Sequence, residues 1–592
     1  MRKADKSAYQ RPPLERTDFV RCPAGPELVS YTTRSLRPAY QILFPPATCS
    51  STTKSSTSTP RREVAPLTDC AGCNGSPGLD RQTCAHLSST RQYCPCGAPL
   101  PSLSPHHPIP DSLLSGPYWL PSRPWDISDR PSQFIPSNHI PSPVSASNMS
   151  TPTATAISAP GKVFLAGGYL VLDRAYSALV FGLSARIHVL VEDIDTSSGV
   201  QLSEIVVQSP QFREATWNYG YRLADQQGGV EVTHLQGSPP ATSSRNPFVE
   251  TALAYALTYI ASISEARISP AKVTILADDD YYSQPTQATL VTKDNFTDFN
   301  LRFADVHKTG LGSSAALVTA FTGAILSHYL APSQFSLTSA EGRTKLHKLA
   351  QAAHCAAQGK VGSGFDVAAA VYGSCVYRRF SPSILESTGE PGSAGFRTRL
   401  QQLVDLADKW DYEIDADSAT IPSGTALVMC DVDCGSQTVS MVKKVQLWQK
   451  ADPVGSRALS DELHKRNRAL ATILESGDLS GVTEAFAAIR EKIREMGQKS
   501  DVPIEPVEQT ELLDTLTKNE GVFGGVVPGA GGYDAIVLLI KNDEATLAAL
   551  RESLSKISAS GTNVKLLKTK GEMEGARTED GTKYGRWLRN QC

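Results

Sequence analysis

Residues 308–320, KTGLGSSAALVTA, combine two glycines, two adjacent serines and a run of small apolar residues. Gly310 and Gly312 lack the Cβ atom that would hold a ligand away from the main chain. The residues after them are expected to open a helix, so several unpaired backbone N–H groups would face one point. Ser313 and Ser314 add hydroxyls that can donate to phosphate or bind Mg²⁺. The segment predicts a phosphate-binding loop, with a glycine C-cap followed by a serine N-cap as the structural alternative.

This loop is not a Walker A motif, because no Gly-Lys-Ser/Thr follows at the required offset. The chain around it predicts an α/β mixture. Asn246 is a plausible N-cap ahead of Pro247 at the start of a helix. The expected strands are 162–172, 185–193, 204–208 and 272–278, and the expected helices are 246–263, 313–330 and 341–358.

A second block begins near residue 400 and again mixes the two kinds of element. Its expected strands are 425–433, 524–529, 533–540 and 563–568, and its expected helices are 437–449, 456–475, 480–496 and 543–557. Strands separated by helices or helix pairs are typical of α+β layering. We therefore predict an α+β fold with two domains, 149–400 and 401–592.

Residues 1–148 differ from the rest and carry 23 of the 39 prolines. Such a Pro- and Ser-rich stretch offers little periodic apolar surface, so we expect a disordered extension. Met149 is the first methionine after Met1, and strand-like patterning begins soon after it. Translation from Met149 is one interpretation, and a targeting arm is the other. Acidic residues among the first thirty, and no apolar core there, disfavour targeting.

Composition excludes several classes of function. The net charge is -3, and no basic cluster is dense enough to follow a nucleic-acid backbone. The longest apolar stretch, 178–191, is interrupted by Arg186 and His188, so no membrane span is expected. Cysteines at 70–73 and 94–96 have poor spacing for zinc, and the five after residue 148 are scattered. That scatter suits a reducing compartment, and we expect a cytoplasmic protein.

Four segments together resemble the motifs of the GHMP small-molecule kinases, in order and at suitable separations. They are 158–173, 308–320, 359–373 and 526–539. Within that superfamily the chain is similar to the fungal-type phosphomevalonate kinases. Mevalonate kinases usually carry Gly-Glu-His where this chain has Gly167-Gly168-Tyr169. The resemblance covers nearly all of 155–592 and implies a two-domain GHMP fold.

The resemblance implies that Lys162, after an Ala-Pro-Gly turn, and Asp366 are catalytic. Lys162 would meet the transferring phosphate, and Asp366 would act as a base or as an electrostatic partner for Lys162. Ser363 and Asp366 also have a spacing close to a capping box, so Asp366 could instead end a helix. The ATP-binding residues implied are Lys308, Thr309, Gly310, Leu311, Gly312, Ser313, Ser314, Ala315 and Ala316.

One position departs from the family pattern. Mevalonate kinases use a glutamate eleven residues before the catalytic aspartate to help bind Mg²⁺, and that position is Cys355 here. A neutral thiol is a poor ligand for a hard cation. We therefore expect Mg²⁺ to be held by Ser314 first and Ser313 second, together with nucleotide phosphates and water.

The acceptor is expected to be a phosphate itself, so a second anion site is needed. Lys360 is its first predicted residue, with Arg186 and Lys308 as weaker candidates, and each of the three could as easily be a surface charge. Ser363 and Tyr169 complete the predicted substrate-binding set. Hydroxyls and lysines of 435–445 could close over the acceptor. Gly529, Gly531 and Gly532 form a glycine motif that would support the site, or only a tight turn.

The predicted reaction transfers the γ-phosphoryl group of ATP, with Mg²⁺, to 5-phosphomevalonate, giving 5-diphosphomevalonate in isoprenoid and sterol synthesis. Two alternatives stay open. One is a GHMP kinase for mevalonate or a sugar, and the other is a catalytically silent nucleotide-binding regulator. We expect a monomer or a weak homodimer.

Overall fold

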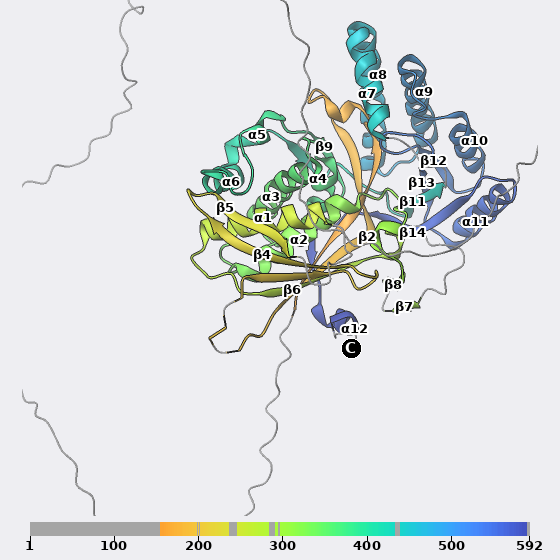
Figure 1. Cartoon of the computed structure of the whole chain (residues 1–592). Helices are drawn as coiled ribbons and strands as arrows, with labels where there is room; N and C mark the ends of the chain where they lie inside the picture. Colours follow the sequence, from red (N-terminus) through yellow and green to blue (C-terminus); the bar gives the residue numbers. More distant parts are fainter. Residues whose placement is uncertain are drawn as a thin grey trace, which may run out of the picture. The chain divides into compact units, whose positions relative to one another are not determined.

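A computed structural model describes residues 154–588, apart from 198, 201, 236–244, 283–290, 294–295 and 433–437. The predicted extension, 1–148, lies outside the described residues, as does the start of the 435–445 segment. Figure 1 shows long strands from both halves of the sequence side by side, with helices packed around them.

Thirteen of the described strands form one sheet. Nine follow the order β12-β13-β11-β14-β2-β6-β3-β4-β5, while β1 and β9 also pair with β2, β15 pairs with β1, and β10 pairs with β9. A separate pair is formed by β7 and β8. The strands are β1 Thr155–Ala166, β2 Ala178–Asp193, β3 Glu204–Gln208, β4 Thr216–Ala224, β5 Gly229–Leu235, β6 Ala271–Ala277, β7 Val291–Lys293, β8 Phe296–Asp298, β9 Cys375–Arg378, β10 Glu413–Asp415, β11 Thr425–Val432, β12 Val522–Val526, β13 Ala535–Lys541, β14 Val564–Glu572 and β15 Arg577–Thr578.

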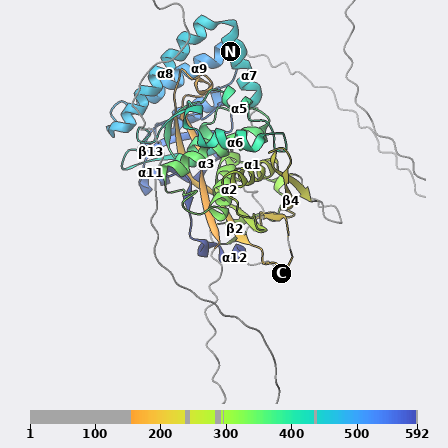
Figure 2. The ribbon, with the colours of Figure 1, turned by 90° about the vertical axis from the view of Figure 1, so that its left-hand side faces the viewer.

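The helices pack on this sheet and on one another. In the first half, α2 packs on β1 and β2 and also contacts α1, α3 and α4. In the second half, α8 and α9 lie side by side in both views (Figure 1, Figure 2). The helices are α1 Pro247–Ile263, α2 Ser313–Tyr329, α3 Ala340–Gln358, α4 Phe365–Tyr372, α5 Ser383–Glu386, α6 Phe396–Asp405, α7 Thr438–Ala451, α8 Pro453–Ser476, α9 Val482–Ser500, α10 Val507–Leu516, α11 Glu544–Ala559 and α12 Gly585–Leu588.

Local signals explain several boundaries. Asn246 caps α1, with its side chain accepting a hydrogen bond from the Val249 N–H, and Pro247 is the first helical residue. The first strand ends at Ala166 because Gly167 takes a φ of 104°. β2 is buried along most of its length, as its apolar sequence and central place in the sheet require.

The predicted α+β class and GHMP fold are confirmed. Every expected helix forms, with α2 and α3 within one residue of their predicted starts and ends. The sheet is continuous across the predicted domain boundary, since β14 pairs with both β11 and β2. The division near residue 400 stays a prediction.

Candidate active site

The predicted phosphate loop lies between Lys308 and the start of α2. Lys308 forms an isolated antiparallel β-bridge with Tyr282. Gly310 and Gly312 both have left-handed backbone, with φ of 72° and 82°. α2 begins at Ser313 with Gly312 as its N-cap and no side chain capping it. The first backbone N–H groups of α2 are therefore open to an anion. Ala315 and Ala316 point their side chains into the core, so they can offer only main-chain groups.

The loop is anchored from one side by Thr309. Its backbone N–H donates to the Tyr281 carbonyl at 3.1 Å, and its hydroxyl donates to the Asp280 carbonyl. The Lys308 ammonium lies 4.6 Å from the centre of the Phe303 ring, and desolvation lowers its pKa. Lys308 also lines a small cavity of about 70 Å³ with Ser313 and Ser314. The aromatic residues of that cavity are Trp217, Phe248, Tyr282 and Phe303.

Lys162 extends from β1 to the phosphate loop. Its backbone N–H donates to the Leu311 carbonyl at 2.8 Å, and its ammonium donates to the Gly310 carbonyl at 3.1 Å. The side chain runs directly past Gly312, where an added Cβ atom would lie 2.9 Å from the Lys162 Cγ. Desolvation lowers the pKa of Lys162, while the charge of Asp366 raises it. The structure therefore brings Lys162, the loop and Asp366 together.

Asp366 lies in the first turn of α4. The N-cap of this helix is Gly364, with a φ of 87°, and no side chain caps it. The capping-box alternative for Ser363 and Asp366 is therefore wrong, because the helix starts one residue too late for Ser363 to be its cap. One Asp366 oxygen accepts from the Val367 N–H at 3.0 Å, and the carboxylate lines a cavity.

His354, which the sequence analysis did not select, connects the two halves of the site. Its Nε2 lies 3.1 Å from the Ser314 hydroxyl and 3.1 Å from the Gln358 amide, and its Nδ1 lies 3.9 Å from the nearer Asp366 oxygen. The ring is 2% exposed, so its orientation is fixed by packing. The only sequence signal was its position next to Cys355, which instead receives a bond from the Gln351 amide at 3.2 Å.

The cavity beside Asp366 has a volume of about 550 Å³. Five predicted residues line it: Tyr169, Lys360, Ser363, Asp366 and Gly529. Helix α7 adds Val442, Lys443 and Gln446 from the second half of the chain, so part of the predicted 435–445 segment does border this cavity. The charged lining is mainly cationic, which suits an anionic ligand.

Tyr169 and the predicted glycine motif meet across this cavity. The Tyr169 hydroxyl donates to the Ala530 carbonyl at 2.6 Å. An added Cβ at Gly168 would lie 2.5 Å from the Gly529 carbonyl, so the two glycine turns touch through their main chains. Gly531 and Gly532 pack on Ile504, whose carbonyl accepts from the Gly532 N–H at 2.9 Å. These contacts show that the motif shapes a wall, while Gly529 alone of the three lines the cavity.

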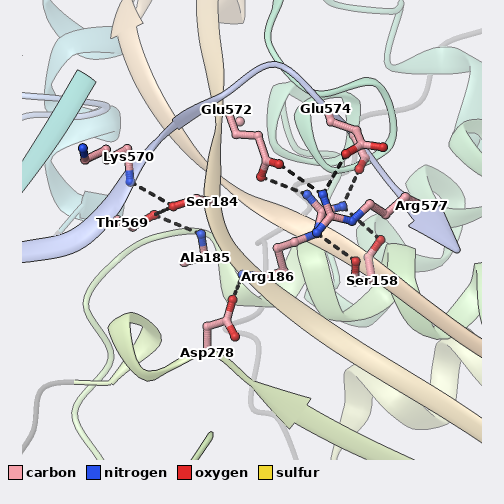
Figure 3. A network of polar contacts seen from close by, with 12 residues as sticks. Ser158, Ser184, Ala185, Arg186, Asp278, Thr569, Lys570, Glu572, Glu574 and Arg577 are labelled. Carbon is pink, nitrogen blue, oxygen red and sulfur yellow. Dashed lines mark hydrogen bonds and ion pairs between the residues drawn. The ribbon is translucent and has the colours of Figure 1, made fainter. Parts of the chain in front are cut away.

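Arg186 is not brought to the cavity. It is 2% exposed, and Figure 3 shows it within a network of polar side chains at the C-terminal segment. Its Nε donates to the Ser158 hydroxyl at 2.8 Å, and one terminal nitrogen lies 3.1 Å from a Glu572 oxygen. Because its guanidinium is occupied there, the predicted substrate contact of Arg186 finds no support in this geometry.

A Mg²⁺ site made wholly of protein ligands is absent from the described residues, where no three His, Cys, Asp or Glu side chains gather. Ser314 and Asp366 are oxygen donors on either side of His354. That set fits a Mg²⁺ ion that keeps water and takes most of its ligands from phosphates. Within the same part of the chain, every helix is too short or too polar to cross a membrane.

Comparisons with known proteins show the family of the chain. Residues 293–374 match the family model of the GHMP kinases N terminal domain, and 479–557 match that of the GHMP kinases C terminal domain. A phosphomevalonate kinase from Gibberella zeae is 56% identical over 438 residues, which cover 73% of this chain and 98% of the relative. One from Aspergillus fumigatus is 45% identical over 488 residues, covering 74% and 99%.

A solved structure shows the same fold. The Lin0012 protein from Listeria innocua is 18% identical with a TM-score of 0.53, and the match covers 72% of this chain and 99% of that one. The extent and identity of the matches to the fungal relatives decide the family. The chain belongs to the phosphomevalonate kinases of the GHMP kinase superfamily.

Proposed function

We propose that this protein transfers the γ-phosphoryl group of ATP to (R)-5-phosphomevalonate, giving 5-diphosphomevalonate and ADP in isoprenoid and sterol synthesis. One observation carries the proposal. Lys162 and Asp366 come from different elements and interact electrostatically. Lys162 contacts the phosphate loop, and Asp366 lines a cavity whose charged residues are mainly cations. The activity named for the fungal relatives supports the choice of acceptor.

The nucleotide phosphates would lie on the open N-terminus of α2. Positioning and charge neutralisation account for most of the catalysis of phosphoryl transfer, and the loop and Lys162 supply both. The aromatic side chains beside Lys308 would border the nucleoside end. Mg²⁺, bound through Ser314 and the phosphates, would neutralise charge on the transferring group.

In the transfer itself, an oxygen of the acceptor phosphate forms a bond to the γ-phosphorus. The bond from that phosphorus to the oxygen bridging it to the β-phosphate breaks, and ADP carries away the electron pair. A phosphate monoester has a second pKa near 6, so its attacking oxygen is already ionised at neutral pH. No base is needed for that step. Asp366 would therefore serve Lys162 electrostatically, holding it charged and oriented despite its desolvation.

The test is turnover by the purified full chain with Mg-ATP and a panel of acceptors, followed by ADP release. We expect turnover with 5-phosphomevalonate and little with mevalonate or galactose. Turnover with mevalonate or a sugar would replace the proposal by a kinase for another acceptor. Nucleotide binding without turnover on any acceptor would favour a regulator.

Three further properties belong to this proposal. We infer that the acting species is a monomer or weak homodimer, which light scattering across concentrations would measure. We infer a cytoplasmic location from the unpaired, buried thiols of Cys355, Cys375 and Cys430. The full acceptor site is taken to include Lys360 and Ser363, which line the cavity.

A further inference from the structure

Arg379 is a buried cation in the wall of the acceptor cavity. It follows β9 directly, is 8% exposed, and lines the 550 Å³ cavity together with Asp366 and Lys360. The sequence analysis did not select it. Nothing in the predicted motifs includes it, and its neighbour Arg378 has the same side chain.

Arg379 has no carboxylate partner within the described part of the chain. Three arginines there are more than nine-tenths buried, and the other two both form ion pairs: Arg186 with Glu572 at 3.1 Å, and Arg490 with Glu505 at 2.8 Å. Among the described residues, Arg379 forms no ion pair. An unpaired buried charge is strongly unfavourable, so this exception calls for a counter-ion from outside the chain.

The titratable neighbours of Arg379 do not supply that counter-charge. The groups whose field acts on it are Tyr377 and Cys355. Burial raises the pKa of both, so both are neutral at physiological pH. Burial lowers the pKa of Arg379 as well, but a guanidinium remains protonated in proteins.

The hydrogen bonds of Arg379 hold it in place without using up its donors. One terminal nitrogen donates to the Leu172 carbonyl at 2.8 Å, and the other donates to the Gly362 carbonyl at 3.0 Å. Its Nε has no hydrogen-bond partner. A guanidinium has five N–H donors, so the buried Nε–H and one N–H on each terminal nitrogen have no protein partner, and the two terminal ones remain for a ligand. The two carbonyls belong to segments that both line the cavity, so Arg379 is rigidly placed between its walls.

We propose that Arg379 binds the carboxylate end of the acceptor, a conclusion that rests on the proposed function. The phosphate end of 5-phosphomevalonate must reach Lys162 and the phosphate loop, which leaves the carboxylate at the opposite end without a partner. A planar guanidinium matches a carboxylate better than the flexible ammonium groups of Lys360 and Lys443 do. Arg379 thereby selects acceptors that carry two anions.

The experiment compares two acceptors in four full-length enzymes. One acceptor is 5-phosphomevalonate, and the other is its carboxamide analogue, which keeps the phosphate and replaces the carboxylate by a neutral amide. The enzymes are wild type, Arg379→Gln, Arg379→Lys and Arg378→Gln. Arg378 is the matched control, since it pairs with Glu413 at 2.8 Å and does not line the 550 Å³ cavity.

In wild type and Arg378→Gln, we expect the carboxamide to raise KM by about tenfold or more, the effect of removing one partner of a desolvated charge pair. In Arg379→Gln, we expect KM for 5-phosphomevalonate to rise by about the same factor and the two acceptors to become nearly equal. The KM for ATP stays unchanged. A purely structural role would alter the KM values of both acceptors and leave their ratio intact.

The assignment is overturned if the ratio of KM for the carboxamide to KM for 5-phosphomevalonate is the same in Arg379→Gln as in wild type. If that variant does not fold, Arg379→Lys decides, because an ammonium cannot reproduce the guanidinium geometry and the ratio must fall. A ratio that stays at the wild-type value in Arg379→Lys would then overturn it. Wild-type enzyme that fails to turn over 5-phosphomevalonate refutes the proposed function itself, which is a different result.

Discussion

Lys162 and Asp366 depend on each other at the level of single side chains. Withdrawal from water disfavours the Lys162 ammonium, and Asp366 is the group whose charge opposes this effect. The lysine also donates to the Gly310 carbonyl, so its position is tied to the phosphate loop. The position of Lys162 therefore depends on the phosphate loop, and its protonation is favoured by the Asp366 carboxylate.

The first prediction concerns this pair. Lys162→Met removes the cation beside the transferring group, and we expect kcat to fall by about 10²–10⁴-fold. Asp366→Asn should lower kcat less, because an ionised acceptor needs no base. Steady-state ADP release measures both, with Lys345→Met, a surface lysine paired with Glu341, as control. A larger loss for Asp366→Asn than for Lys162→Met would show that Asp366 takes a proton.

The second prediction concerns His354. His354→Phe fills the same space but removes the bonds to Ser314 and Gln358, so kcat should fall by about 10²-fold through misplacement of the loop serine. KM for 5-phosphomevalonate should change little. Cys355→Ala is the control, because its sulfur contacts Gln351 and does not line this cavity. Equal kcat losses in the two variants would mean that α3 packing alone matters.

At the scale of elements, the loop between Lys308 and Ser313 uses its two glycines differently. Both have positive φ, yet an added Cβ meets nothing within 4 Å at Gly310 and meets Lys162 at Gly312. Gly310 is thus a conformational requirement, whereas Gly312 also makes room for the Lys162 side chain.

The third prediction follows from that difference. Alanine at either position should lower stability by about 1–2 kcal/mol, because both take left-handed backbone. Only Gly312→Ala should also lower kcat strongly, since its Cβ displaces the Lys162 side chain. Thermal midpoints and kcat measured on the same preparations separate the two effects. Gly310→Ala with the lower kcat would contradict the geometry.

The fourth prediction concerns α3, which buries His347 completely. Both ring nitrogens lack hydrogen-bond partners, and desolvation lowers the pKa of His347 to about 3. Between pH 6.5 and 3 the unfolded chain binds a proton that the folded chain does not. Stability is therefore full above the unfolded pKa and falls as the pH drops, by about 2 kcal/mol at pH 5 for this group.

We expect His347→Phe to lose that part of the pH dependence. Its packing among Tyr372, Trp410 and Tyr412 suits an aromatic ring. Denaturant midpoints at pH 5 and pH 7 measure the difference, with the exposed His307→Gln as control. The same pH 5 loss in His347→Phe and wild type would show that His347 is protonated in the fold.

The features that can be predicted from the sequence are those that depend on residues close together in the chain. The long helices, most of the strands and the loop at Gly310 and Gly312 are predicted because caps, apolar periodicity and glycine act locally. The expected strand 162–172 is wrong at both ends, because β1 spans Thr155–Ala166 and Leu170–Leu172 forms a 3-10 helix after the turn at Gly167. The roles of His354 and Arg379 could not be predicted in that way, since they depend on which chemical groups distant elements bring beside them. Arg186 shows the reverse case: its charge suggested an anion site, but its carboxylate partner is Glu572, 386 positions later in the chain.

At the scale of the whole molecule, one sheet joins the two halves of the chain. Gly571 and Glu572 of β14 pair with Leu183 and Gly182 of β2, and β15 pairs with β1. The charged side chains in Figure 3 lie at this junction, where Arg577 contacts Glu572, Glu574 and Glu579.

The fifth prediction tests that junction. Arg186→Met removes a buried guanidinium and leaves Arg577 as the remaining partner of Glu572, and we expect a loss of about 1–3 kcal/mol. KM for ATP and for the acceptor should not change. Adding Glu572→Gln should restore part of the loss, which a double-mutant cycle on thermal midpoints would measure. Strict additivity would show that the two side chains do not interact.

This junction also has a consequence for biosynthesis. Arg186 and Glu572 are separated by 386 positions, so a ribosome makes the guanidinium long before its carboxylate exists. Until β14 is made, β1 and β2 lack this carboxylate, and water must solvate the Arg186 guanidinium. Lys162, carried on β1, therefore gains its complete framework only after β14 and β15 have been made and have paired with β2 and β1.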